Sequence, residues 1–403
     1  MPSVALEEIL NAARPGVSLE QQLYTSGAIF RQDLNLVFGR NWLYAGHLAR
    51  IPRPGDYFTF ELGTESLIII RSDRDQIHAV WNVCRHRGSR ICTEPAGSAR
   101  TLVCPYHQWA YARDGRLLKA RLMQDATPPG RYDLACAEVR ILEGLIFVHL
   151  GDEPQDFAEF QRLMEPRMRH HVLESARLAH LRTYEIRANW KLVLENSREC
   201  YHCGAGHPQY CRAVGFAAAI GSPDLAQQDA ALQQLKPSSE QDPGIESAEV
   251  PFTPHGWYHF RRFRLRSDFV TESMDGRAVA PLMGSLPGWD TGSFAIVTLP
   301  NLLLEANSDY VMTLRITPAG PQRTLAEVCW FVHGGAREGI DYDVDRLTEF
   351  WRLTSEQDWK LCEDNQLGVN SSRYVPGPYG PDERGVEHFV RWYLHQLQPR
   401  QER

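Results

Sequence analysis

The strongest constraint on the fold of this chain is a pair of short segments, Cys84-x-His86 and Cys104-x-x-His107. Two thiolates and two imidazoles bind one metal centre only if a scaffold holds both segments at the same end. The surrounding sequence alternates short apolar segments with turn residues, and the apolar segments lie at 56–60, 66–71, 77–81 and 145–150. Such alternation is typical of β-strands. We therefore expect a small all-β domain that presents the two segments on adjacent loops.

The ligand types and their spacing indicate which centre is bound. A structural zinc ion accepts two cysteines and two histidines and is the main alternative. A [2Fe–2S] cluster with cysteines on one iron and histidines on the other uses the same four residues. The pattern favours the cluster, because the two spacings differ and Pro105 follows a cysteine. Cys92, between the two segments, is expected to be a buried free thiol.

A second candidate metal site lies at 189–208. Read as a helix, this stretch places Glu195, Glu199 and His202 on one narrow arc beside an apolar face. Two glycines are expected to end the helix and to turn His207 back towards His202. Two neutral imidazoles brought together in this way suit a metal ion. In the alternative, the histidines bond to the backbone and the acids pair with nearby basic side chains.

A mononuclear iron held by two histidines needs one carboxylate, which leaves positions open for O2 and substrate. In the helix predicted at about 341–366, Asp358 lies on the largely apolar stripe, whereas the neighbouring acids point elsewhere. A carboxylate on a buried face needs a cation or several donors to offset desolvation. Asp358 is therefore the predicted third ligand, and the alternative is an aspartate paired with an arginine. Glu199 is close enough in sequence to hydrogen-bond His202 and orient it.

A rival arrangement combines Cys200 and Cys203 with His202 and His207 as a zinc site or a redox pair. Thiolate ligands would disfavour oxygen chemistry, and both cysteines fall on the apolar arc, so we expect neither to bind the metal. Glu195 is expected to be a structural acid. The aromatic residues of 257–263 are expected to pack in the core rather than to line a cation site.

These motifs resemble those of the α subunits of Rieske non-haem iron oxygenases. The two Cys/His segments look like the cluster loops, Glu199-Cys-Tyr-His-x-x-x-x-His207 resembles the iron-binding motif, and 358–363 resembles the segment of the third ligand. The resemblance implies an α+β fold with an all-β Rieske [2Fe–2S] domain and a helix-grip catalytic domain, an antiparallel sheet with helices that holds mononuclear Fe(II). We expect an N-terminal helical segment at 1–37 that packs on the catalytic domain, the Rieske domain at 38–154 and the catalytic domain at 155–403.

The resemblance is closest to the oxygenase components that demethylate glycine betaine and proline betaine. It implies that O2 is used to hydroxylate an N-methyl group of a small, cationic methylated amine, and that formaldehyde is released. It also implies a homotrimer in which Glu199 links His202 to His107 of the partner subunit. Because no G-x-G-x-x-G motif lies between a strand and a helix, NAD(P)H is expected to be oxidised by a separate flavin and iron–sulfur reductase. The alternatives are a ring-hydroxylating oxygenase of an aromatic acid, an electron carrier and a zinc-stabilised binding module.

Charge and composition narrow the remaining possibilities. The formal net charge of −7 at pH 7 gives no electrostatic reason to expect a nucleic-acid partner. We expect no signal peptide, and no apolar run approaches the ~20 residues that a membrane span needs. Nine cysteines without dense spacing predict free thiols and metal ligands in a reducing compartment, so we expect a cytoplasmic protein.

Overall fold

The computed structural model describes residues 9–10, 14–73, 76–123, 128, 130–214, 253, 256–289 and 291–398. The chain forms two compact units. The small unit comprises Gly39–Phe157, and the large unit comprises Met1–Phe38 together with Ala158–Arg403.

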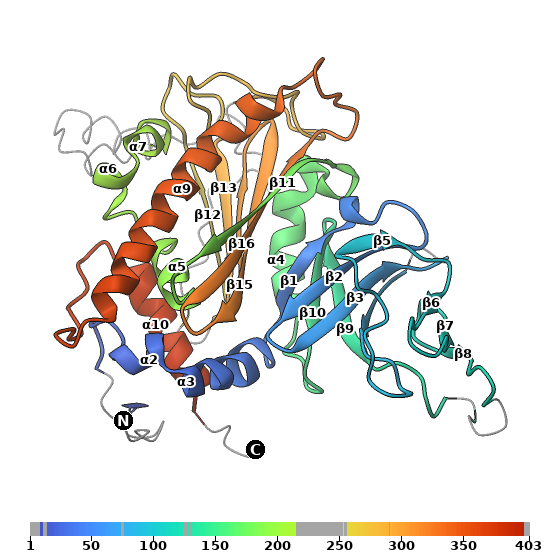
Figure 1. Cartoon of the computed structure of the whole chain (residues 1–403). Helices are drawn as coiled ribbons and strands as arrows, with labels where there is room; N and C mark the ends of the chain where they lie inside the picture. Colours follow the sequence, from blue (N-terminus) through green and yellow to red (C-terminus); the bar gives the residue numbers. More distant parts are fainter. Residues whose placement is uncertain are drawn as a thin grey trace. The chain divides into compact units, whose positions relative to one another are not determined.

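The small unit is built on antiparallel sheets (Figure 1). Its larger sheet has seven strands in the order β1 (Leu43–His47), β10 (Leu145–His149), β9 (Cys136–Leu142), β4 (Ile77–Trp81), β3 (Glu65–Arg71), β2 (Asp56–Leu62) and β5 (Ala96–Ser98). A second sheet pairs β6 (Leu102–Val103), β7 (Ala110–Tyr111) and β8 (Leu117–Lys119). One core cluster joins the two sheets, because Ile68 and Val80 of the first pack with Tyr111 of the second. A short 3-10 helix, η2 (Leu48–Arg50), follows β1.

The large unit contains a six-stranded antiparallel sheet in the order β11 (Arg177–Ile186), β16 (Arg323–Val332), β15 (Tyr310–Gly320), β14 (Leu302–Ala306), β13 (Ser293–Thr298) and β12 (Tyr258–Phe263). The long helix α9 (Val344–Val369) lies across one face of this sheet (Figure 1). It starts where the Asp343 side chain accepts the Arg346 N–H. Trp359 of α9 packs on Tyr184 of β11, so this face of the sheet is buried beneath the helix. The fold is therefore α+β, as predicted.

Shorter helices complete the large unit: α2 (Gln21–Thr25), α3 (Gly27–Gln32), η1 (Asp33–Phe38), α4 (Ala158–Met168), η4 (Arg169–His171), η5 (Leu173–Ser175), α5 (Trp190–Asn196), α6 (Cys203–Gly206), α7 (Pro208–Val214) and α10 (Arg384–Gln396). Trp257 and Tyr258 pack against Phe160 of α4, with ring centroids 4.8 and 5.1 Å from it. This part of the aromatic run therefore serves core packing. None of the described helices is long and apolar enough to cross a membrane.

A buried carboxylate ties the N-terminal helices to the rest of the large unit. Asp33, at the start of η1, is fully buried and lies 2.5 Å from the Lys191 ammonium of α5. It also accepts hydrogen bonds from the Trp190 indole at 3.0 Å and from the Tyr393 hydroxyl at 2.7 Å. Since a buried charge needs a partner and donors, this network fixes η1 against α5 and α10.

Candidate metal centres

The small unit brings its four predicted cluster ligands together. The first Cys/His segment follows β4, and the second joins β6 to β7. Cys84 and Cys104 are 2% and 1% exposed and belong to the core cluster. His86 and His107 are half-buried, and their ring centroids lie 4.6 Å apart. Two buried sulfurs and two neighbouring imidazoles thus lie at the end of two adjacent loops.

Tight backbone turns shape both loops. The Gly88 N–H donates to the Cys84 carbonyl, and the Gln108 N–H donates to the Cys104 carbonyl. Both donors have positive φ, 78° at Gly88 and 61° at Gln108. A positive φ is uncommon for a residue with a side chain and usually marks a functional constraint. The strain at Gln108 therefore fits a loop shaped around a ligand.

The surroundings of the loops fit a bound cluster. The Tyr111 hydroxyl lies 3.3 Å from Cys84 Sγ, and Trp109 stacks on His86 with ring centroids 5.0 Å apart. His86 Nδ1 is buried and has no hydrogen-bond partner in the described part of the chain. Burial raises the pKa of the Cys84 thiol, so a bound cation is needed to hold it as a thiolate.

The spread of the ligands distinguishes a cluster from a single ion. Among the described residues, two groups of at least three ligand atoms lie within 4.8 Å of one another, and neither includes Cys84 or Cys104. One tetrahedral zinc ion needs all four ligand atoms within about 4 Å of each other. The wider spacing suits a centre with two irons, each held by its own pair of ligands.

Residues 189–203 do not form the single helix expected from their periodicity. Helix α5 ends at Asn196, and the chain then turns before α6 begins at Cys203. Two side chains stabilise the turn, because the Ser197 hydroxyl donates to the Leu194 carbonyl at 2.7 Å and Glu199 accepts the His202 N–H at 3.3 Å. These local bonds replace helical ones. Glu195 therefore does not share an arc with Glu199.

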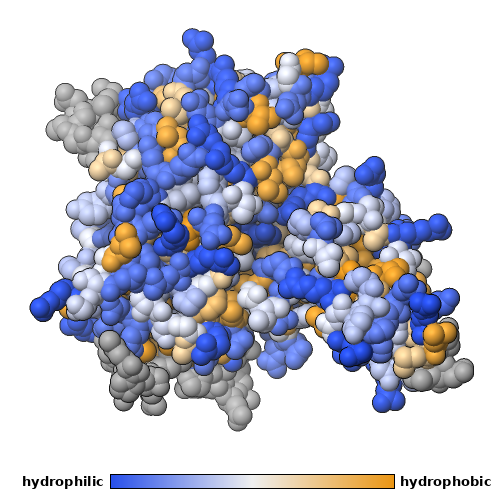
Figure 2. Space-filling view, viewed as in Figure 1, coloured by the Kyte–Doolittle hydropathy of each residue, from blue (hydrophilic) through white to orange (hydrophobic). Residues whose placement is uncertain are grey.

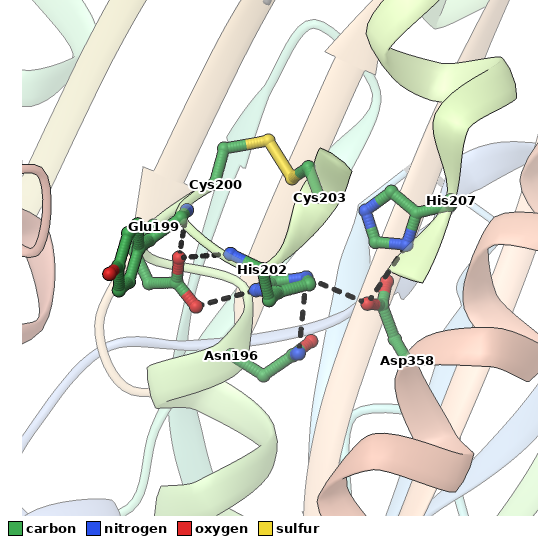
Figure 3. Close-up of a disulfide and its surroundings, with 8 residues drawn as sticks. Asn196, Glu199, Cys200, His202, Cys203, His207 and Asp358 are labelled. Atoms are coloured by element: carbon green, nitrogen blue, oxygen red, sulfur yellow. Dashed lines mark hydrogen bonds and ion pairs between the residues drawn. A yellow bond between two sulfur atoms is a disulfide. The ribbon is translucent and has the colours of Figure 1, made fainter. Parts of the chain in front are cut away.

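The turn nevertheless brings the three predicted iron ligands together. His202, His207 and Asp358 form one of the two ligand groups within 4.8 Å. Asp358 Oδ1, on α9, lies 3.2 Å from His202 Nε2 and 3.6 Å from His207 Nδ1 (Figure 3). His207 is 2% exposed, and its Nδ1 has no hydrogen-bond partner among the described residues. Two imidazoles and one carboxylate that converge on one point are the donor set of a mononuclear iron.

Electrostatics within the group follow from these contacts. Burial lowers the pKa of His202, but hydrogen bonds to Asp358 and Glu199 outweigh it and raise the pKa to about 9. Burial also lowers the pKa of His207, so this imidazole is neutral at pH 7. A lone pair on a neutral, buried imidazole is available to a metal. Asn196, whose amide nitrogen lies 3.4 Å from His202 Nε2, is a further neighbour that helical periodicity did not single out.

Glu199 holds the far side of His202. Its Oε1 lies 2.5 Å from His202 Nδ1, and its Oε2 accepts the backbone N–H of Tyr201 (Figure 3). The expected hydrogen bond to His202 is therefore present, although it is made from a turn rather than from a helix. Tyr201 is 71% exposed, so Glu199 lies just beneath the surface of the large unit.

The prediction of free thiols is wrong for Cys200 and Cys203. The structure joins them in a disulfide with a Cα–Cα distance of 4.9 Å, because the turn after α5 brings their side chains to the same side. They also form a ligand group with His207, but sulfurs joined in a disulfide are not thiolates and cannot act as anionic ligands. The group with Asp358 therefore suits iron better. Cys92 is a buried free thiol, as predicted.

Glu195 has a structural partner. Its carboxylate accepts the Tyr24 hydroxyl of α2 at 2.9 Å. Burial raises the pKa of Glu195 to about 8, so the side chain is largely protonated at pH 7. It therefore joins α5 to the N-terminal helices and takes no part in the metal group.

Comparison with known proteins agrees with both centres. The Rieske [2Fe–2S] domain family matches residues 41–136, and the family of ring-hydroxylating α subunits (catalytic domain) matches residues 173–399. The glycine betaine monooxygenase oxygenase subunit of Chromohalobacter salexigens is 36% identical over 401 residues, which cover 96% of this chain and 88% of that protein. The subunit of the same name from Pseudomonas aeruginosa strain UCBPP-PA14 is also 36% identical, over 98% of this chain and 92% of that protein.

Among solved structures, a quaternary ammonium Rieske monooxygenase has the same fold. The TM-score is 0.73 at 21% identity, and the match covers 98% of this chain and all of that one. That structure is described in terms of carnitine oxidation by gut microbiota and inter-subunit electron transfer.

Proposed function

We propose that this chain, which belongs to the family of Rieske-type ring-hydroxylating oxygenase α subunits, demethylates a betaine-like quaternary ammonium compound. It is the terminal oxygenase component of its system and uses a [2Fe–2S] Rieske cluster and a mononuclear iron. The observation that carries the proposal is the near full-length similarity to glycine betaine monooxygenase oxygenase subunits, together with the convergence of His202, His207 and Asp358.

The ligand assignments belong to this proposal. Cys84, Cys104, His86 and His107 would hold the cluster, and the group that includes Asp358 would hold the iron. When bound, the cluster supplies single electrons, and the iron uses them with O2 to hydroxylate a C–H bond. The protein keeps the four cluster ligands on strained, closely packed loops and keeps His207 neutral and buried.

The reaction balances with one O2 and two electrons. One oxygen atom enters an N-methyl C–H bond, and the other leaves as water with two protons. The hydroxymethylammonium product then breaks its C–N bond, which releases formaldehyde, a proton and the demethylated amine. The electrons come from NAD(P)H through a separate flavin and iron–sulfur reductase.

Glu199 would connect the two centres. We infer a homotrimer in which its carboxylate orients His202 and reaches His107 of the partner subunit. Its position just beneath the surface supports this role, since Oε1 is 2.5 Å from His202 Nδ1 and the side chain is 12% exposed. Apolar side chains exposed near the cluster loops, at Val103 and Tyr106, supply surface for a neighbouring copy; Figure 2 shows apolar residues over the region of β6–β8.

A formaldehyde assay tests the activity. The protein, supplied with a surrogate reductase and NADH, should release formaldehyde from glycine betaine or a related betaine, in a ratio of about one to the O2 consumed. A cis-diol from an aromatic acid, without formaldehyde, would instead identify a ring-hydroxylating dioxygenase. The absence of turnover with every methylated ammonium compound in the panel would refute the proposal.

Mixed trimers test the connection between subunits. Cys84→Ser should lack the cluster and His207→Ala the iron, so each variant alone should be inactive. Co-expressed subunits with two affinity tags should regain activity, because the cluster of one copy serves the iron of the next. Glu199→Gln should retain both metals and lose turnover, whereas Glu185→Gln, an exposed acid on β11, should change neither. Mixed trimers that stay inactive would place electron transfer within one chain.

A further inference from the structure

Two acidic side chains are buried on the sheet face beneath α9, outside the metal group. Glu305 of β14 is 5% exposed, and Glu272, in the segment before β13, is 1% exposed. The Ser293 hydroxyl donates to Glu305 Oε2 at 3.1 Å. A buried carboxyl group is either protonated or paired with a cation, so a cation that reaches this pair would favour its ionised form.

The two carboxylate oxygens of Glu272 differ in their hydrogen bonds. Its Oε2 accepts hydrogen bonds from the Asn307 amide at 2.9 Å and from the Trp351 indole at 3.1 Å. Its Oε1 is buried and has no hydrogen-bond partner among the described residues. Burial raises the pKa of Glu272 to about 7, and burial followed by the charge of Glu272 raises the pKa of Glu305. Asn307, which donates to Glu272, lies two residues after Glu305, so the two carboxylates are neighbours at the end of β14.

The acid pair lies one aromatic layer from the metal group. The Trp351 ring, which donates to Glu272, has its centroid 5.7 Å from that of Tyr210. The Tyr210 ring in turn lies 5.6 Å from His207 in an edge-on arrangement. Burial, and then the charges of Glu305 and Glu272, raise the pKa of Tyr210. Tyr210 thus lies between the proposed iron ligand His207 and Trp351, and Trp351 in turn contacts Glu272.

The strand register fixes what else faces Glu305. Ala295 of β13 lies beside it on one side and Met312 of β15 on the other, and Arg261 of β12 follows in the same row. Arg261 lowers the pKa of Glu305 and is the charged group that β12 contributes to this row. One arginine beside two carboxylates leaves the described lining negative when both acids are ionised.

We propose that Glu272 and Glu305, with the rings of Tyr210 and Trp351, form a subsite for the ammonium head of the substrate. Carboxylates and aromatic faces both attract a quaternary ammonium ion, which spreads its charge over its methyl groups and has no N–H to donate. A quaternary ammonium held here has its methyl groups near the metal group and relieves the repulsion between the two acids. This inference rests on the proposed function and identifies the residues that select its substrate.

A ligand with the shape of glycine betaine but without its positive charge tests whether the subsite recognises charge or only shape. 3,3-Dimethylbutanoate has the shape of glycine betaine, with a carbon atom in place of the nitrogen. Glu305→Gln keeps an acceptor for Ser293 and removes one negative charge. The variant should bind glycine betaine roughly tenfold more weakly, while its affinity for 3,3-dimethylbutanoate should stay within about twofold. Isothermal titration measures both affinities, and formaldehyde release reports the Michaelis constant.

Matched variants complete the test. Glu327→Gln removes a carboxylate from β16 that pairs with Arg315 at 3.2 Å, and it should change neither affinity. Glu272→Gln provides a second measurement if Glu305→Gln does not fold. Suppose that the wild type demethylates betaines and that both variants keep the wild-type preference for glycine betaine over the isostere. This result overturns the subsite and leaves the proposed function standing. A wild type that neither binds nor demethylates any quaternary ammonium compound overturns the proposed function as well.

Discussion

The substitution Asp33→Asn tests how the N-terminal helices support the metal-binding region. Asp33 and Lys191 are 0% exposed, and their charged groups lie 2.5 Å apart. Asparagine keeps an oxygen that can accept the Tyr393 hydroxyl, so the main loss is the negative charge. The Lys191 ammonium then stays buried on α5, the helix that leads into the turn with His202, without its counter-charge.

The size of the effect follows from the burial of the pair. Removal of one partner from a buried ion pair destabilises a protein by about 3–5 kcal/mol. Two aromatic rings, Trp190 and Tyr393, lie 4.9 Å from the ammonium and retain part of its stabilisation. We therefore expect a loss of about 3 kcal/mol in the free energy of unfolding of the large unit.

The pH dependence has a definite sign. Burial lowers the pKa of Lys191, and Asp33 opposes that shift, so the substitution lowers the pKa further. A base whose pKa is lower in the folded state binds more protons when unfolded, and stability rises with pH across that interval. The deficit of Asp33→Asn relative to wild type should therefore shrink as the pH rises towards the ordinary lysine pKa of 10.5.

Urea unfolding followed by far-UV circular dichroism measures the loss. Asp364→Asn is the matched control, because it breaks an ion pair with Lys360 in which both side chains are more than half exposed, and it should cost less than about 1 kcal/mol. Asp33→Asn combined with Lys191→Met should be more stable than Asp33→Asn alone. A single variant within about 1 kcal/mol of wild type, or a double variant with no recovery, would refute the reasoning.

Three further predictions concern the metal group and its surroundings. His207→Ala should lower the iron content from about three to about two per chain and leave the visible spectrum of the cluster unchanged; loss of that spectrum would contradict the ligand assignment. Cys200→Ser with Cys203→Ser should retain the mononuclear iron by metal analysis, and its loss would favour a thiolate site. The raised pKa of Glu195 stabilises the folded state below pH 4.5, and this contribution is lost as the pH rises through about 8. The free energy of unfolding of wild type should therefore fall between pH 5 and 8.5, and that of Glu195→Gln should lack this fall.

The strands that could be predicted from the sequence are those with a run of apolar side chains, because such a run indicates burial. Segment 66–71 is rich in branched apolar residues and forms β3, an interior strand of its sheet. β11 carries no such signal, because it is an edge strand with mostly polar and half-exposed residues. Its ten residues are held by pairing with β16, which is a long-range contact that a local pattern does not contain.

The helix predicted across 189–203 failed for a local reason. Apolar and polar positions do follow a helical period there, but Ser197 and Glu199 bond to nearby backbone groups and end α5 at Asn196. Side chains that can satisfy the backbone outside a helix compete with helix formation, and the hydrophobic pattern does not register this competition. The prediction of a hydrogen bond from Glu199 to His202 survived, because three residues of separation keep the two side chains within reach in either conformation.

Metal ligands and substrate-recognition residues differ in how far sequence can identify them. Cysteine and histidine at fixed short spacings can be read from one segment, and Asp358 stands out as an acid on an apolar stripe. Glu305 is a weaker example, because it is an acid within the short apolar strand Leu302–Ala306. No sequence pattern singles out Glu272. Their proximity arises from strand register, the hydrogen bond from Trp351 on α9 and the position of Tyr210 beside His207. Since the proposed subsite depends on those three long-range relations, proteins with the same metal ligands can differ in substrate through residues that no short motif contains.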